Sequence, residues 1–113
     1  MKKAILISLS VAALATSGMC ADKNYGATAF NKWCKNCHGV NGDKYGGGKS
    51  AQIAFLEKKD IITALKDYRA GTRNIHGMGK VMKSEALTMK DDEIEAVADY
   101  VVSLKPKAKL ITN

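Results

Sequence analysis

Residues 34–38 carry the pattern most capable of chemistry in this chain: two cysteines three positions apart, followed directly by a histidine. On one helical turn, Cys34 and Cys37 can each add a thiol to a vinyl group of a single porphyrin. His38 then lies under the iron and can ligate it. The C-x-x-C-H pattern therefore predicts the attachment site of one haem c, with Cys34 and Cys37 binding the cofactor and His38 binding the metal.

Three other functions use a C-x-x-C pair. A thioredoxin-like redox pair usually sits between a strand and a helix, and no strand-like run precedes Cys34. Half of a zinc site would need two further ligands at regular spacing, and the sequence offers only Cys20 and His76 besides. A structural disulfide is the third alternative. The haem interpretation is favoured, and the start of the chain supports it.

The first 21 residues have the layout of a secretory signal peptide. Lys2 and Lys3 form a basic start, and residues 4–15 form an apolar run that is too short to span a bilayer. Small residues follow, as they do before a cleavage site. Because c-type haem is attached after export, the signal peptide and the haem motif support each other and indicate a periplasmic protein.

The mature protein is expected to be one domain, residues 22–113, after removal of residues 1–21. The cleavage point stays open, because Ala15 and the region of Cys20 both offer sites. A lipid anchor on Cys20 is a further alternative, although the bulky Met19 before it is unfavourable for one.

The composition is moderately basic and excludes some classes of partner. The chain has 18 basic and 11 acidic residues, a net charge of +7. Without Lys2 and Lys3 the basic residues fall to 16 against 11 acidic ones, which leaves +5. A basic surface suits docking to acidic partner proteins. We expect no nucleic-acid partner, because the lysines are scattered and the protein is exported. No segment after residue 21 is apolar enough for a transmembrane helix.

Helical periodicity marks three segments, and no stretch alternates convincingly enough to be a strand. The first covers residues 24–35. The second begins with an N-cap at Asp60 and ends at Gly71. The third follows a capping box of Thr88 and Asp91, has acids in its first turn and ends at the only proline. The glycine-rich stretch between the first two helices is predicted to be a loop around the porphyrin edge. The fold class is therefore all-α.

The sixth ligand of the iron decides between an electron carrier and a site for small molecules. The candidates after the haem motif are His76, Met78, Met82 and Met89. Met89 is expected to pack in the first turn of the last helix, whereas Met78 and Met82 lie in a glycine-punctuated segment predicted to be a loop over the haem. We favour Met82 and keep Met78 and His76 as alternatives.

A thioether ligand would suit an electron carrier. Its soft, neutral sulfur favours Fe(II), and a filled sixth site keeps oxygen and peroxide from the metal. With an open sixth site, the alternative is a haem protein that binds gases or reacts with peroxide.

The residues resemble those of the class I cytochromes c of the small bacterial kind, similar to the cytochrome c-553 group. Gly26 and Phe30 precede Cys34 at the spacing of that family, which uses them where the first helix crosses the last. Val97 and Tyr100 fall where the family has their partners.

Two further features extend the resemblance over residues 22–113. Residues 68–74 resemble the family's Y-x-x-G-x-R-N stretch. Met82 precedes Lys90, at the start of the last helix, by eight positions, as the family's axial methionine does, so the resemblance favours Met82 over Met78.

The resemblance implies a fold and a function. The fold would be a small cytochrome c fold, with three or more helices wrapped around one covalent haem. The protein would be a monomeric electron carrier and not an enzyme. Its donor would be a quinol-oxidising complex, and its acceptor a terminal oxidase or a haem peroxidase.

One departure from the family concerns His38. The family commonly has a proline a dozen or more residues after this histidine, and the carbonyl of that proline accepts the Nδ1–H of the ring. The only proline here is Pro106. We therefore expect another carbonyl, near residues 49–52, to accept this proton. The family also often caps the last helix with a serine, where this chain has Lys90.

Overall fold

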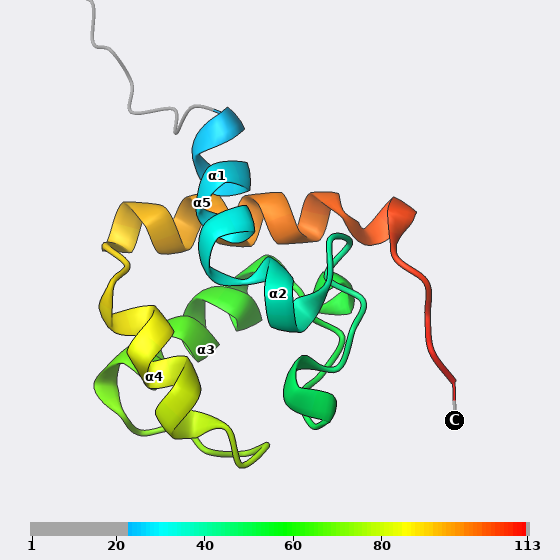
Figure 1. The fold of residues 1–113 in the computed structure, drawn as a ribbon. Coiled ribbons are helices and arrows are strands. Elements are labelled where there is room, and N and C mark those ends of the chain that lie inside the picture. Colours follow the sequence, from blue (N-terminus) through cyan, green and yellow to red (C-terminus); the bar gives the residue numbers. More distant parts are fainter. Residues whose placement is uncertain (1–22, 113) are drawn as a thin grey trace, which may run out of the picture.

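The computed structural model describes residues 23–112, so the predicted signal peptide, residues 1–21, lies outside the described residues. Within the described residues the fold is helical and has no strand, which confirms the all-α fold class (Figure 1). No helix in this part of the chain is long and apolar enough to cross a membrane. The helices are α1 (Lys23–Trp33), α2 (Lys35–His38), η1 (Gly46–Gly48), η2 (Ile53–Phe55), α3 (Lys58–Ala70), α4 (Gly79–Leu87), α5 (Asp91–Ser103) and η3 (Lys105–Lys107).

Helix α1 crosses α5, as the family resemblance at Gly26 and Phe30 implied (Figure 1). Gly26 permits the close approach, because a Cβ added there would overlap the carbonyl oxygen of Ala96. Phe30 packs its ring against Tyr100, with the ring centroids 5.2 Å apart and the planes tilted by 54°. The crossing fixes α1, and with it the haem motif that follows, against the longest apolar helix.

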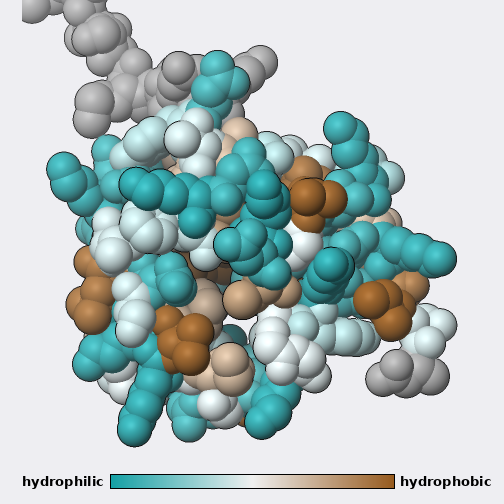
Figure 2. All heavy atoms as spheres, in the orientation of Figure 1, coloured by the Kyte–Doolittle hydropathy of each residue, from teal (hydrophilic) through white to brown (hydrophobic). Residues whose placement is uncertain are grey.

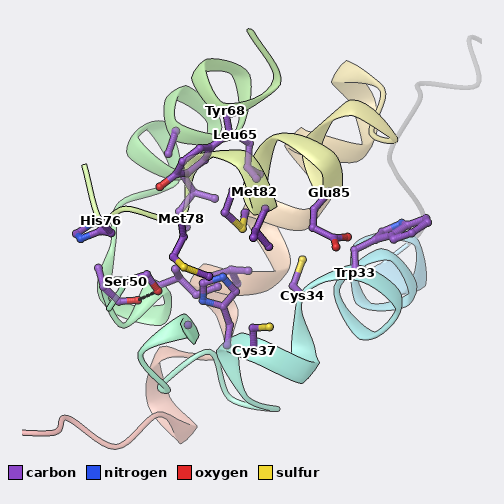
Figure 3. Close-up of a pocket in the computed structure, with 18 of the residues that line it drawn as sticks. Trp33, Cys34, Cys37, Ser50, Leu65, Tyr68, His76, Met78, Met82 and Glu85 are labelled. Carbon is purple, nitrogen blue, oxygen red and sulfur yellow. Dashed lines mark hydrogen bonds between the residues drawn. The ribbon is translucent and has the colours of Figure 1, made fainter. Parts of the chain in front are cut away.

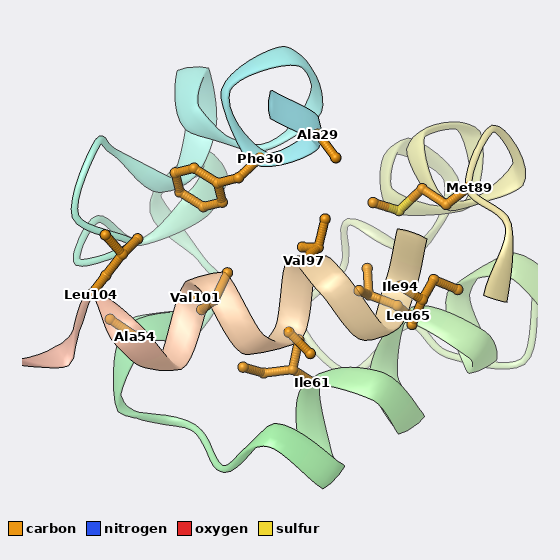
Figure 4. Packing of buried hydrophobic residues seen from close by; sticks show 11 residues of the cluster. Ala29, Phe30, Ala54, Ile61, Leu65, Met89, Ile94, Val97, Val101 and Leu104 are labelled. Atoms are coloured by element: carbon orange, nitrogen blue, oxygen red, sulfur yellow. The ribbon is translucent and has the colours of Figure 1, made fainter. Parts of the chain in front are cut away.

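The core lies on both sides of α5 (Figure 4). Val97 and Val101 point from α5 toward Phe30 of α1, while Ile61 of α3 approaches α5 from the other side. Phe30, Ile94, Val97 and Val101 are fully buried. Burial of each is worth about 1.5–3 kcal/mol relative to exposure, so the apolar stripe of α5 is the main cohesive element of the fold.

Helix α3 begins earlier than expected. The prediction of an N-cap at Asp60 is wrong, because the helix starts at Lys58 and Asp60 lies in its first turn. The extra turn carries Lys58 to α5, where its ammonium contacts Glu95 at 3.2 Å and Asp99 at 2.9 Å. The predicted end is confirmed: Gly71 caps the helix in the left-handed region, at φ 79°.

Helix α4 was not predicted. The segment expected to be a loop around Met82 is helical from Gly79 onward, so the expectation that Met82 lies on a loop is wrong. The Oδ1 atom of Asn74 accepts the N–H of Gly79 at 2.8 Å and thereby satisfies a free donor at the helix start. Helix α4 packs on α3, and its Gly79 and Ala86 are buried.

The capping box predicted before α5 does not form. The hydroxyl of Thr88 donates to the carbonyl oxygen of Glu85 at 2.7 Å, so Thr88 belongs to the end of α4. Lys90 is the N-cap residue and makes no side-chain cap. The first turn is instead held by Asp91, whose carboxylate contacts the Arg69 guanidinium of α3 at 2.6 Å.

Gln52 connects the loop beside the haem motif to the end of the chain. Its Nε2 donates to the carbonyl oxygens of Asp43 at 2.7 Å and Lys109 at 2.8 Å, and its Oε1 accepts the N–H of Ile111 at 3.1 Å. The hydroxyl of Tyr45 also donates to the Ile111 carbonyl, at 3.1 Å. Gln52 is buried, so these bonds fix the loop in place.

Hydrophilic residues cover most of the face seen in Figure 2, and hydrophobic residues form small separate groups on it. Among the described residues, the large apolar side chains most exposed include Ile75, Val40 and Leu110.

Candidate haem-binding site

The helices enclose a cavity of about 200 Å³, and the predicted site residues lie in its wall (Figure 3). One side comes from the haem motif and the loop after it. The opposite side comes from α3 and α4, and α5 contributes Val97 and Val101. The site residues Cys34, Cys37, His38 and Met82 all line this one cavity, as do the alternatives Met78, His76 and Met89.

Local structure brings both cysteines to the cavity. Helix α1 ends at Trp33, Cys34 is the N-cap of the single turn α2, and the N–H of His38 donates to the Cys34 carbonyl at 3.0 Å. Cys34 and Cys37 therefore lie on one turn, and both thiols are free. This geometry leaves both sulfurs available to one ligand in the cavity.

The Cys34 thiol is poorly suited to thiolate chemistry. Burial, with a smaller contribution from the charge of Glu85, raises the pKa of Cys34 to about 12. A dithiol redox pair needs an accessible sulfur that ionises near neutral pH. The environment of Cys34 therefore disfavours this residue as the attacking thiol of a thioredoxin-like pair.

His38 is buried and neutral. Burial lowers the pKa of its imidazole, and a neutral ring is the form that binds a metal. The ring lies against the backbone of Gly46: a Cβ added there would lie 2.7 Å from Cε1 and 3.1 Å from Nδ1 of His38. Gly46 thus leaves room for the imidazole and restricts its rotation.

The expected carbonyl partner of His38 is not found. Nδ1 of His38 is buried and has no hydrogen-bond partner among residues 23–112, so the expectation that a carbonyl of residues 49–52 accepts its proton is wrong for this geometry. An unpaired buried polar atom is costly, and such atoms are rare.

Met78 and Met82 are one turn apart at the start of α4. Met78 is the N-cap residue, and Met82 donates its N–H to the Met78 carbonyl at 3.0 Å. Met82 is half-buried and packs against the hydrophobic core. Met78 approaches the loop instead, where a Cβ added to Gly47 would lie 2.9 Å from its methyl carbon. His76 lies before this turn, and Met89 is buried in the core after it.

Sequence reasoning missed two charged residues of the cavity wall, Arg73 and Glu85. The Arg73 guanidinium lies 5.6 Å from the ring centroid of Tyr68, and its buried Nε has no partner. The signal for Arg73 was present in the Y-x-x-G-x-R-N stretch, which was used only as a sign of resemblance. No sequence motif marks Glu85. Its side chain points toward Cys34 because of its place on helix α4, which was not predicted (Figure 3).

The cavity fits a haem by its chemistry. Its wall is mostly apolar, as a porphyrin face requires, and it holds two free thiols on one turn beside a neutral imidazole. The buried, unpartnered Nε of Arg73 is a donor suited to a carboxylate such as a haem propionate.

This fold and site define a small helical protein in which the turn of a C-x-x-C-H motif and a methionine-bearing helix line one mostly apolar cavity. The Cytochrome c family model matches residues 24–105. The chain therefore belongs to the cytochrome c family.

Curated relatives agree with this assignment along nearly their whole length. A cytochrome c-553 of Helicobacter pylori (strain ATCC 700392 / 26695) is 30% identical over 103 residues, which cover 91% of this chain and 99% of the relative. A cytochrome c-553 of Nitratidesulfovibrio vulgaris (strain DSM 19637 / Miyazaki F) is 30% identical over 104 residues, 90% of this chain and 99% of the relative. The predicted resemblance to the c-553 group is confirmed.

Family membership confirms the predicted cofactor and the class of function. A cytochrome c carries covalently attached haem c, and the motif at residues 34–38 fits that attachment. The protein is a monohaem electron carrier and not an enzyme.

Proposed function

We propose that this cytochrome is a periplasmic electron shuttle whose single low-spin iron is bound by His38 and Met82. Cys34 and Cys37 are the attachment points of the haem. When bound, the haem supplies an iron that gains and loses one electron. The observation that carries the proposal is that one cavity collects both thiols, the neutral His38 imidazole and a thioether from the facing helix.

The choice of Met82 over Met78 has support from packing. Met82 is held within a helix and contacts the core, whereas Met78 lies at the helix start with non-helical backbone angles, φ −110° and ψ 21°. A ligand that barely moves between oxidation states keeps the reorganisation energy small. Met82 is the better placed of the two for that role.

The charge pattern supports exchange with acidic partners. Lys80 and Lys83 are exposed on α4 on either side of Met82, and Lys49 is exposed on the loop beside the cavity. We propose a quinol-oxidising complex as the donor and a terminal oxidase or haem peroxidase as the acceptor. Docking through these lysines should make the rate of electron transfer fall as ionic strength rises.

The localisation rests on residues 1–21, which we propose to be a cleaved signal peptide. N-terminal sequencing of the mature protein from a periplasmic extract tests this directly. A mature chain that begins between residues 16 and 22 supports export and cleavage, whereas an intact Met1 contradicts them.

A matched pair of variants tests the ligand assignment. Reduced wild-type protein should bind carbon monoxide slowly or not at all, because the sixth site is filled. Met82→Ala should bind it readily, and Met78→Ala should behave like wild type. Ready binding by the wild type would instead support an open sixth site and a gas- or peroxide-handling protein. Ready binding by Met78→Ala alone would reassign the ligand to Met78.

A further inference from the structure

The unpaired Nδ1 of His38 and the hydroxyl of Ser50 both border Gly46. A Cβ placed on Gly46 would lie 3.1 Å from Nδ1 of His38 and 2.7 Å from Oγ of Ser50, so both atoms border the same point. Ser50 is held there by its own backbone, because its N–H donates to the Gly46 carbonyl at 3.1 Å. Gly46 therefore lies close to both the His38 ring and the Ser50 hydroxyl.

The Ser50 hydroxyl has a free acceptor site. Within residues 23–112 its one hydrogen bond is a donation to the carbonyl oxygen of Ala51 at 3.4 Å, near the outer limit for a hydrogen bond. A hydroxyl can donate one hydrogen bond and accept two. Ser50 can therefore accept a proton from one side while it still donates to Ala51 on the other.

We infer that Ser50 is the positioning residue of the proximal histidine, and that Nδ1–H of His38 donates to Ser50 Oγ, which in turn donates to the Ala51 carbonyl. Formation of the first bond requires the Ser50 side chain to turn toward the ring, because Gly46 limits rotation of the imidazole itself. The inference rests on the proposed role of His38 as the iron ligand. In this chain a side-chain hydroxyl would take the place of a proline carbonyl.

The loop that carries Ser50 is held firmly enough for such a role. Gln52, two residues on, is buried and bonded to Asp43 and to the C-terminal segment at Lys109. A fixed acceptor restrains the ring plane and makes the other ring nitrogen more basic. A more basic ligand stabilises Fe(III), so Ser50 should lower the reduction potential.

Two variants of the haem-loaded protein test the inference. Ser50→Ala should raise the midpoint potential and make solvent exchange of the His38 Nδ1 proton, followed by NMR in the reduced state, on the order of tenfold faster. Ser50→Thr keeps the hydroxyl, so its midpoint potential and its Nδ1 proton exchange rate should match those of the wild type. Ser103→Ala is the control: it removes an exposed serine that does not line the cavity and should change neither.

Unchanged potential and unchanged proton exchange in Ser50→Ala would overturn the inference, because another acceptor would then hold the proton. If Ser50→Ala does not retain haem, the wild-type spectrum decides. A nuclear Overhauser effect from the Nδ1 proton to the Ser50 β protons supports the bond, and its absence contradicts it. The long-wavelength band of methionine-bound Fe(III), recorded on the same samples, tests His/Met ligation separately. The hydrogen bond from His38 to Ser50 and the methionine ligation can therefore be contradicted independently of each other.

Discussion

Met82 follows Met78 by one turn of α4, and its N–H donates to the Met78 carbonyl at 3.0 Å. Both thioethers line the cavity that also contains His38. On the proposed ligation, the position of α4 therefore governs how the Met82 sulfur meets the iron. At its start, the Oδ1 atom of Asn74 accepts the N–H of Gly79 at 2.8 Å.

Replacement of that cap should loosen the methionine ligand. Loss of a capping side chain typically costs about 1 kcal/mol, so we expect Asn74→Ala to lower the free energy of unfolding by about that amount. Because the loss falls on α4, carbon monoxide should bind the reduced variant faster than the wild type. Denaturant unfolding and stopped-flow mixing measure the two effects. A stability loss without faster binding would show that α4 does not control access to the iron.

The haem motif and the helix α5 could be predicted from sequence because their signals are local. Cys34 and His38 are neighbours, and the apolar stripe that contains Val97 and Val101 repeats at helical spacing. The crossing of α1 and α5 came from the family resemblance. The structure places Gly26 where only a residue without a side chain fits.

Helix α4 could not be predicted because its stability is not local. It has nine residues, and isolated helices of that length are marginal in water. Contact with α3 and the Asn74 cap hold it, and both depend on the tertiary fold. The roles of Arg73 and Gln52 were missed for the same reason: what each does depends on the fold around it.

Gln52 should be important for stability although it lies outside the proposed ligand set. Gln52→Ala leaves the Asp43 and Lys109 carbonyls and the Ile111 N–H without their partner. A hydrogen bond typically contributes about 0.5–1.5 kcal/mol, and three partly buried bonds are lost, so we expect Gln52→Ala to lower the free energy of unfolding by roughly 1–3 kcal/mol in guanidinium. Tyr45→Phe removes only an exposed bond to the same segment and should cost less than about 0.5 kcal/mol. If the two variants lose equal free energies of unfolding, Gln52 is not the main connection between the loop and the C-terminal segment.

Arg73 should tune the reduction potential. The Arg73 guanidinium, whose Nε is buried in the cavity wall, disfavours the extra positive charge of Fe(III), so Arg73→Gln should lower the midpoint potential. We expect a shift on the order of tens of mV, given that about 59 mV corresponds to a tenfold change in a one-electron equilibrium. Arg69→Gln is the matched control, because Arg69 pairs with Asp91 and does not line the cavity. Similar shifts in both variants would contradict a specific role of Arg73.

The Arg69–Asp91 pair predicts a pH effect on stability. A hydrogen bond from the Arg69 guanidinium and its charge hold the pKa of the Asp91 carboxyl below its usual range. The stabilisation is therefore present above the unfolded-state pKa and is lost as pH falls through the folded-state value. The difference in free energy of unfolding between wild type and Asp91→Asn should therefore decrease as the pH falls. The same difference should be smaller in high salt, because Asp91 is exposed and its charge is screened. If this difference in free energy of unfolding stays constant from pH 7 to pH 2, the Arg69–Asp91 ion pair does not stabilise the fold.

The most direct test of the account is an absorption spectrum of the oxidised wild-type protein purified from the periplasm. Ligation by His38 and Met82 predicts a weak long-wavelength band from charge transfer between methionine sulfur and Fe(III). A haem-loaded protein without this band would contradict methionine ligation, and with it the proposed electron shuttle with a closed sixth site.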